Sequence, residues 1–241
     1  MKFGIKTYNS EKFLDKFVDK CDFFEVQAIR KNDYSFLEKY NKEIVIHCEH
    51  QGFGINIADI SNLDDCIEAI EFAKHLANKV NAKRIVIHPG HFENESCSVD
   101  NTLNFLNKYC DERFVIENMP FFGGKDKSLR IGSSVEEMKL ILERTNLGFC
   151  FDINHAIEYS LKDGLNYWKI IQEFEKLNPI HYHLGGEKIS EGKSHISFCD
   201  SDLNLKKVFE LISKDAEITL EVGMNEKEVE NDLKLVTELN L

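Results

Sequence analysis

The sequence has little of what marks a secreted or membrane protein. Its seven cysteines are an odd number with no Cys-x-x-Cys pair, which excludes a disulfide framework and favours buried, reduced thiols. No apolar run approaches the roughly 20 residues that cross a bilayer. The charged start, Met1 to Tyr8, is not typical of a signal peptide. We therefore expect a cytoplasmic protein with no membrane contact and no obligate protein partner.

Basic residues are scarce relative to acidic ones. The chain has 30 lysines and arginines against 42 aspartates and glutamates, a formal net charge of −12. Such a chain lacks the broad basic surface that non-specific binding to nucleic acid or anionic membranes requires. The charge does not exclude a local site for anions, because bound divalent cations add charge that the sequence count omits.

Linkers and internal repeats are absent as well. The chain has only three prolines, no Pro/Ser-rich stretch and no shift in composition along its length. We therefore expect residues 1–241 to form a single domain, which is long enough for a full core. There is also no Gly-rich dinucleotide fingerprint, which weakens the alternative of a doubly wound open sheet.

What the chain does contain is a regular alternation of short apolar runs and helical stripes. The run Gly148–Asp152 alternates with period two, so Phe149 and Phe151 are expected on one face and Cys150 on the other. Eight such runs are expected as strands, at residues 3–7, 23–27, 43–47, 84–88, 114–117, 148–152, 180–184 and 217–221. Eight strand–helix units in this length predict an α/β fold, a (β/α)8 TIM barrel with its site at the carboxyl ends of the strands.

Some connecting elements are also predicted. Ser61 is expected to cap the helix that carries Leu63 and Ile67. One helix is expected to follow strand 148–152 and run to about Leu177. A long polar loop is expected to reach Ser201.

Six of the eight predicted strands end in a histidine or a carboxylate, and two further histidines follow closely. A single histidine or carboxylate at a strand end is usually an ordinary polar residue with no functional role. A carboxylate such as Asp152 is costly to bury there without a partner, so the recurrence favours a shared ligand. His, Asp and Glu without Cys suit Zn²⁺, Mn²⁺ or Fe²⁺. We predict a divalent-metal site, with Zn²⁺ the expected ion, held by His47, His88, Glu117, Asp152, His155, His183, His195 and Glu221.

The residue two positions before each strand end should face the barrel interior, one layer lower. These residues are Val45, Val86, Val115, Cys150, His181 and Thr219. Four of the six are small or apolar, as a packed barrel interior requires, and His181 departs furthest from this pattern. His181 is either a hydrogen-bond partner that orients His183 or a core histidine. We interpret Cys150 as packing.

Five short motifs give the chain a resemblance to a known family. They are Ile85-Val-Ile-His-Pro-Gly90, Val115-Ile-Glu-Asn118, Phe151-Asp-Ile-Asn-His-Ala156, His183-Leu-Gly-Gly-Glu-Lys188 and Leu220-Glu221. In this order the chain resembles the endonuclease IV branch (AP endonuclease family 2) of the xylose isomerase-like barrels. The resemblance implies three zinc ions and matches the eight predicted ligands to eight of that family's nine. Related isomerases and epimerases use one ion, held by the equivalents of Glu117, Asp152, His183 and Glu221.

Departures from the endonuclease pattern concern the loops. The ninth ligand, an Asp, is replaced by Lys193. Either the site then binds fewer metal ions than the family's, or Lys193 holds a substrate phosphate. Alternatively, Glu191 supplies the carboxylate. His50 and His91 each lie three residues beyond a predicted ligand and are candidate substrate contacts or ordinary loop histidines. The aromatic stretch that the repair enzymes insert into DNA is missing.

Three functions remain open from the sequence. The first is a metal-dependent phosphoester hydrolase with a small phosphoester or nucleic-acid substrate, in which Glu117 bridges two metals. The second is a single-metal sugar isomerase or epimerase, in which Glu117 and Glu221 act as acid and base. The third is a relative that binds without catalysis. The segment Gly123-Gly-Lys125 is either a phosphate contact or a flexible loop.

Overall fold

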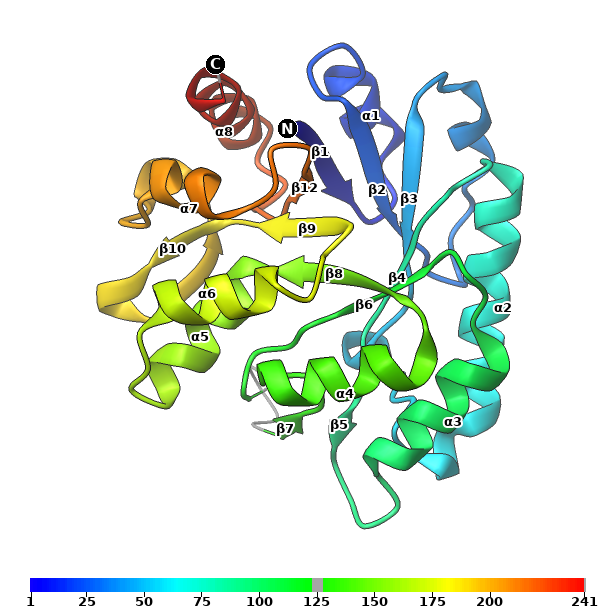
Figure 1. Cartoon of the computed structure of the whole chain (residues 1–241). Coiled ribbons are helices and arrows are strands. Elements are labelled where there is room, and N and C mark those ends of the chain that lie inside the picture. Colours follow the sequence, from blue (N-terminus) through cyan, green and yellow to red (C-terminus); the bar gives the residue numbers. More distant parts are fainter. Residues whose placement is uncertain (123–127, 241) are drawn as a thin grey trace.

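The computed structural model describes residues 1–122 and 128–240, which form a closed parallel barrel surrounded by helices (Figure 1). Strand β1 pairs with both β2 and β12, and this closes the barrel. The predicted (β/α)8 fold is therefore confirmed. In barrel order the strands are β1 (Lys2–Thr7), β12 (Glu217–Leu220), β9 (His181–Leu184), β8 (Gly148–Asp152), β6 (Phe114–Glu117), β4 (Ile85–Ile87), β3 (Glu43–His47) and β2 (Phe23–Gln27).

The outer layer consists of helices, several of which begin at the capping residues that the sequence provides. Ser10, Ser98 and Ser134 each accept a hydrogen bond from a backbone N–H of the first turn. The α-helices are α1 (Glu11–Phe17), α2 (Leu63–Lys79), α3 (Val99–Tyr109), α4 (Val135–Thr145), α5 (Ile153–Lys162), α6 (Tyr167–Glu175), α7 (Leu205–Leu211) and α8 (Glu226–Leu239). Short 3₁₀ helices are η1 (Ser35–Lys39), η2 (Gln51–Phe53), η3 (Ile60–Asn62), η4 (Ile189–Glu191) and η5 (Phe198–Asp200). No helix among the described residues is long and apolar enough to cross a membrane.

The two faces of each strand contribute to different cores. On β8, Phe149 and Phe151 belong to the large core between strands and helices, as the alternation predicts. The barrel interior holds a small separate cluster of Phe23, Val45, Val86, Val115 and Cys150. Its lower end is tightly filled, since a Cβ on Gly4 would lie 2.3 Å from Cε2 of Phe23. The inward layer predicted from the strand pattern is thus present.

Three local predictions were wrong. Ser61 does not cap α2, because Asp59 caps the preceding turn η3 by accepting from the Ser61 N–H. The helix expected to continue to Leu177 is interrupted between α5 and α6, where Gly164 adopts a positive φ of 66° and Asn166 caps the next helix. The polar loop before Ser201 contains an antiparallel hairpin.

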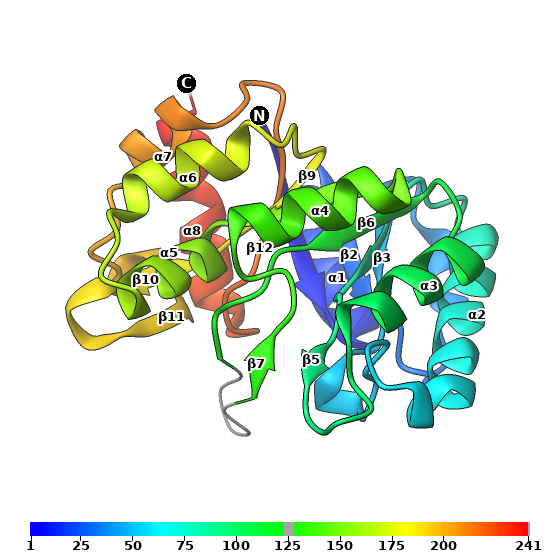
Figure 2. The ribbon, with the colours of Figure 1, turned by 60° about the horizontal axis from the view of Figure 1, so that its bottom comes forward.

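That hairpin and a second one extend the barrel at the strand ends. The first is formed by β10 (Gly186–Lys188) and β11 (Lys193–Ile196), directly after β9. The second pairs β5 (His91–Phe92) with β7 (Leu129–Arg130), which follow β4 and β6. Figure 2 shows all four short strands toward the bottom of the view, on one side of the barrel. They surround the edge at which the predicted ligands end their strands.

Candidate metal centre

The carboxyl ends of the barrel strands meet at a cavity of about 530 Å³. Six of the eight predicted ligands line it: His47, His88, Glu117, His155, His195 and Glu221. Asp152 and His183 lie behind this lining with no exposed surface. His183 Nδ1 is 3.4 Å from Glu117 Oε1, so these two residues belong to the same cluster. The structure therefore brings all eight residues together.

Glu117 lies at the centre of this cluster, and its two carboxylate oxygens face different histidines. Oε2 is 3.2 Å from His47 Nε2 and 3.0 Å from His88 Nε2. Oε1 is 3.4 Å from both His155 Nδ1 and His183 Nδ1. Burial opposes ionisation, but His88 and His183 hold the pKa of Glu117 well below its ordinary value. Glu117 is therefore a carboxylate with ligand sets on both sides.

Asp152 links the cluster to helix α5. Its Oδ1 caps the helix by accepting from the His155 N–H at 2.8 Å, which explains an Asp at this strand end. Its Oδ2 is 3.5 Å from His155 Nδ1 and 4.0 Å from His195 Nε2. Asn118 fixes the Asp152 backbone through hydrogen bonds of 2.7 Å and 2.9 Å. One carboxylate oxygen is thus fixed by the fold while the other faces the cluster.

The cluster divides into overlapping groups whose ligand atoms lie within 4.8 Å of one another. Glu117 belongs to two of the groups, and so does Asp152. The groups are His47–His88–Glu117, Glu117–Asp152–His183, Asp152–His155–His195 and Glu25–His47–Glu221.

The chemistry of these atoms fits a divalent cation. Asp152 Oδ2, His183 Nδ1 and His195 Nδ1 are buried and have no hydrogen-bond donor or acceptor among the described residues. Buried polar atoms are rarely left without a partner, because the cost of desolvation is then not offset. Several such atoms within one cluster of carboxylates and imidazoles meet the requirements of a metal site.

Three of the histidines are oriented by oxygen acceptors outside the cluster. His47 Nδ1 is 2.9 Å from the Cys48 carbonyl, His155 Nδ1 is 2.8 Å from the Asn118 carbonyl, and His88 Nδ1 is 3.3 Å from Gln51 Oε1. An Nδ1–H that donates to an oxygen leaves the Nε2 lone pair for a metal. Burial lowers the pKa of His88 to about 4 in spite of nearby Glu117, so this ring is neutral at pH 7. A neutral ring is the form that binds metal.

His195 reaches the cluster through an unusual backbone conformation. Its φ is 53°, in the left-handed region that non-glycine residues seldom adopt. The hairpin passes close to β9 here, because a Cβ on Gly185 would lie 2.8 Å from His195 Cα and 2.6 Å from the Glu221 carbonyl oxygen. Glycine at 185 therefore allows β11 to place His195 beside Asp152. Strained backbone of this kind is typical of functional positions.

The remaining candidates are distributed differently. His50 lines the cavity, and its ring stacks on His88 with centroids 4.8 Å apart. His91 lies buried on β5, with Nε2 3.4 Å from Glu93 Oε2, and is not part of the described cavity lining. Lys193 is exposed and pairs with Glu191 at 2.6 Å, so the structure brings neither residue to the cluster. The segment Gly123-Gly-Lys125 lies outside the described residues.

Two charged residues beside the cluster were missed from the sequence. Glu25, in the middle of β2, has no exposed surface, and Lys6, on β1, lines the cavity. Lys6 Nζ forms ion pairs with Glu221 and, at 3.3 Å, with Glu25 Oε1. The available signal was a charged residue in phase with the inward face of an apolar strand. Lys6 follows Gly4 by two positions, and Glu25 follows Phe23 by two.

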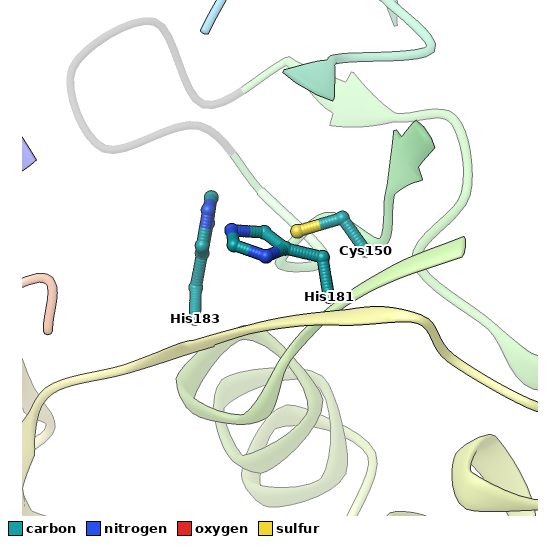
Figure 3. A group of neighbouring side chains, drawn as sticks. All are labelled: Cys150, His181 and His183. Atoms are coloured by element: carbon teal, nitrogen blue, oxygen red, sulfur yellow. The ribbon is translucent and has the colours of Figure 1, made fainter. Parts of the chain in front are cut away.

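The barrel interior one layer below the cluster contains a further histidine, His181. Figure 3 shows Cys150 of β8 and His181 and His183 of β9, whose side chains point toward one another inside the barrel. All three are completely buried. Cys150 is adjacent to His181 in the sheet register. This places His181 directly beneath the metal-ligand layer.

The chain is similar to proteins with different activities. It is 28% identical over 209 residues to the uncharacterized protein MJ1614 of Methanocaldococcus jannaschii, covering 78% of this chain and 75% of that protein. A crystal structure of a D-tagatose 3-epimerase-like protein matches with a TM-score of 0.78 and 20% identity over 99% of this chain and 97% of the other. Endonuclease IV from Thermus thermophilus matches with a TM-score of 0.72 and 15% identity over 99% and 98%. At these identities the two structural matches show the fold alone.

A match to a family model shows which family the chain belongs to. The model described as a xylose isomerase-like TIM barrel matches residues 27–239, most of the chain. Members of this superfamily are enzymes, endonucleases and sugar epimerases among them, and they bind divalent metals. Together with the closed barrel and the ligand cluster at its mouth, the match shows that the chain belongs to the xylose isomerase-like TIM barrel family.

Proposed function

We propose that this protein is a metal-dependent hydrolase of phosphoester bonds that uses two or more divalent ions. The observation that carries the proposal is the position of Glu117 between two groups of possible ligands, His47 and His88 on one side and His183 with Asp152 on the other. A single ion needs only one side of this carboxylate. His47 and His88 on its other side add a second set of possible ligands that shares Glu117.

Each residue of the cluster has a separate role in this proposal. When bound, divalent ions supply polarisation of a phosphoryl oxygen and activation of water at neutral pH. Glu117 holds two ligand sets at a fixed separation, and the neutral His88 presents Nε2 to one of them. Asp152, His155 and His195 form a further set of possible ligands. His50, stacked on His88, adds a polar group at the edge of the substrate space.

The cavity favours a small phosphoester or a single strand over duplex DNA. A volume of about 530 Å³ lies in the range typical of small-molecule sites. The net charge of −12 offers few residues to neutralise the phosphates on which duplex affinity depends. We therefore expect weak cleavage of abasic duplex DNA relative to smaller substrates.

A sugar isomerase or epimerase is the second candidate, and one observation favours it. Glu117 Oε1 and Glu221 Oε1 lie 3.4 Å and 3.1 Å from the same atom, His183 Nδ1. Two carboxylates beside one ligand position can hold one ion and also move a proton on either side of a sugar carbon. In this alternative His47 and His88 have no role in catalysis.

A variant of His88 separates the two candidates. Protein reconstituted with Zn²⁺, Mn²⁺ or Fe²⁺ is assayed against chromogenic phosphomonoesters and phosphodiesters, abasic oligonucleotides and ketoses. We expect phosphoester hydrolysis in the wild type and a loss of about 100-fold or more in His88→Gln, since a ligand of one metal is removed. The matched control is His75→Gln, at an exposed histidine of α2, which should retain full activity. Ketose epimerisation without phosphoesterase activity, unaffected by His88→Gln, would overturn the proposal.

A further inference from the structure

His183 is the one predicted metal ligand among the described histidines whose second ring nitrogen faces a buried carboxylate outside the ligand set. Its Nε2 lies 3.0 Å from Glu25 Oε2. The same oxygen is 2.9 Å from His181 Nε2 and accepts a hydrogen bond from Thr219 Oγ1 at 2.7 Å. All four residues are completely buried. Glu25 is therefore the centre of a closed polar network directly beneath the metal cluster.

The direction of these hydrogen bonds follows from the charge of Glu25. Lys6 Nζ lies 3.3 Å from Glu25 Oε1, and Oε2 accepts from the Thr219 hydroxyl, which is the environment of an ionised carboxylate. An ionised carboxylate has no proton and only accepts hydrogen bonds. The ring nitrogens that face Glu25 must therefore be donors, which places a proton on His183 Nε2.

This proton position determines what His183 offers to the cluster. A neutral imidazole with a proton on Nε2 carries its lone pair on Nδ1. His183 Nδ1 lies 3.1 Å from Glu221 Oε1, 3.4 Å from Glu117 Oε1 and 4.0 Å from Asp152 Oδ2. The orientation is opposite to that of His47, His88 and His155, which present Nε2. Without Glu25, nothing else described in contact with His183 selects this tautomer.

Lys6 maintains the charge of Glu25. Its Nζ lies 3.3 Å from Glu25 Oε1, on the opposite side of the carboxylate from the histidines. It also pairs with Glu221, a predicted metal ligand. A buried carboxylate without such a partner would take up a proton and could then no longer accept from three donors. Lys6 thus connects Glu25 to the cluster by a second route.

A separate metal site at Cys150, His181 and His183 is a weaker interpretation of the same region. Their possible ligand atoms lie close enough together, as Figure 3 shows. However, Glu25 already occupies Nε2 of both histidines. Burial raises the pKa of the Cys150 thiol to about 12, and the thiol form binds metal poorly. The network is therefore better explained as support for the centre above it.

We propose that Glu25, charge-balanced by Lys6, is a positioning residue that fixes His183 in the Nε2–H tautomer and so aims Nδ1 at the metal. The inference rests on the metal centre of the proposed function. Carboxylates that hold a ligand histidine typically contribute about 10- to 100-fold in metal affinity. Neither Glu25 nor Lys6 needs to touch substrate for this role.

Two measurements test the inference. In Zn²⁺-loaded wild-type protein, ¹⁵N NMR of the imidazoles, assigned with His183→Gln, should show a protonated Nε2 and an unprotonated Nδ1 in His183. This experiment requires no change at Glu25. In Glu25→Gln, which keeps the shape but removes the charge, we expect Zn²⁺ affinity, measured by competition with a chelating dye, to fall about 10- to 100-fold.

Glu175→Gln is the matched control, because Glu175 also hydrogen-bonds to a residue of β9, Tyr182, at 3.1 Å, but on the outer face of the barrel. Its Zn²⁺ affinity should stay within about threefold of the wild type, since Glu175 contacts no ligand. A proton on His183 Nδ1, or equal affinity in Glu25→Gln and Glu175→Gln, would overturn the inference alone. A wild type that binds no divalent ion would overturn the proposed metal centre and this inference with it.

Discussion

The interior of the barrel has two unlike halves beneath one ligand layer. Under β3, β4, β6 and β8 the side chains are apolar or weakly polar: Val45, Val86, Val115 and Cys150. On β1, β2, β9 and β12 the interior positions next to them carry Lys6, Glu25, His181 and Thr219, which form one network. In the first half, backbone carbonyls and an amide orient the histidines. In the second half, charged side chains orient His183.

The difference shows two ways to orient a histidine of the proposed metal centre. His47 and His155 donate to carbonyl oxygens that the barrel fixes in any case, so the layer below them only needs to pack. Among the described contacts of His183 there is no such carbonyl; the buried carboxylate of Glu25 takes its place, and Lys6 balances its charge. A charge added to the apolar half should therefore destabilise the protein, and so should removal of a charge from the polar half.

The largest effect is expected from a charge placed in the apolar half. Val115→Asp buries a carboxylate in the cluster with Val45, Val86 and Cys150, whose members carry no positive charge. We expect the free energy of unfolding to fall by about 5 kcal/mol, as for other uncompensated buried charges. Urea unfolding followed by circular dichroism measures this loss. Val115→Thr, of similar size and uncharged, is the control and should cost much less; a loss below about 1 kcal/mol in Val115→Asp would contradict the two-half description.

Removing charge from the polar half should have the next largest effect. Lys6→Met leaves Glu25 and Glu221 without their cation, and we expect a loss of about 3 kcal/mol in protein kept metal-free with a chelator. Added Zn²⁺ should reduce the difference from wild type, because a divalent ion then balances Glu221. A deficit that is absent, or that Zn²⁺ leaves unchanged, would show that the lysine does not balance these carboxylates.

These predictions also show what the sequence could and could not provide. The period-two alternation was enough to place β2, β3, β6 and β8 at their observed bounds and to find Val45, Val86 and Val115. The strand-end residues were enough to find the eight residues of the cluster, because parallel strands bring their carboxyl ends together. Lys6 and Glu25 were missed, because a charged residue inside a strand usually faces solvent. They face the interior only because the sheet closes into a barrel.

The loops were the least predictable part. The spacing of Lys193 in the sequence matched a ligand position of the family. In the structure, the hairpin β10–β11 places its side chain in solvent beside Glu191. The hairpin depends on contacts far away in the chain, such as the hydrogen bond from Ser197 Oγ to Asp232 of α8 at 2.9 Å. His195, two residues later, reaches the cluster only through its positive φ. Neither property can be deduced from local spacing.

A smaller effect concerns pH and the apolar half. The pKa of His88 is lowered to about 4 in the folded protein by burial, against about 6.5 in an unfolded chain. Unfolding therefore takes up a proton between these values, so the His88 contribution to stability is complete above pH 6.5 and is lost as the pH falls toward 4. We expect a loss of about 2 kcal/mol between pH 7 and pH 4.5 in metal-free protein. Urea unfolding at pH 7, 5.5 and 4.5 should show a steeper decline in wild type than in His88→Gln; parallel declines would mean that this histidine is not buried in neutral form.

The most direct test of the central claim is the number of metal ions that one chain holds. Wild-type protein and Glu117→Gln are dialysed against excess Zn²⁺ and then against buffer, and bound zinc is counted by elemental analysis and native mass spectrometry. If Glu117 joins ligand sets on its two sides, the wild type retains two or more ions per chain. The variant then loses more than one of them, because both sets share the altered carboxylate. A wild type that holds a single ion, which the variant merely binds less tightly, would contradict the account and favour the single-metal isomerase.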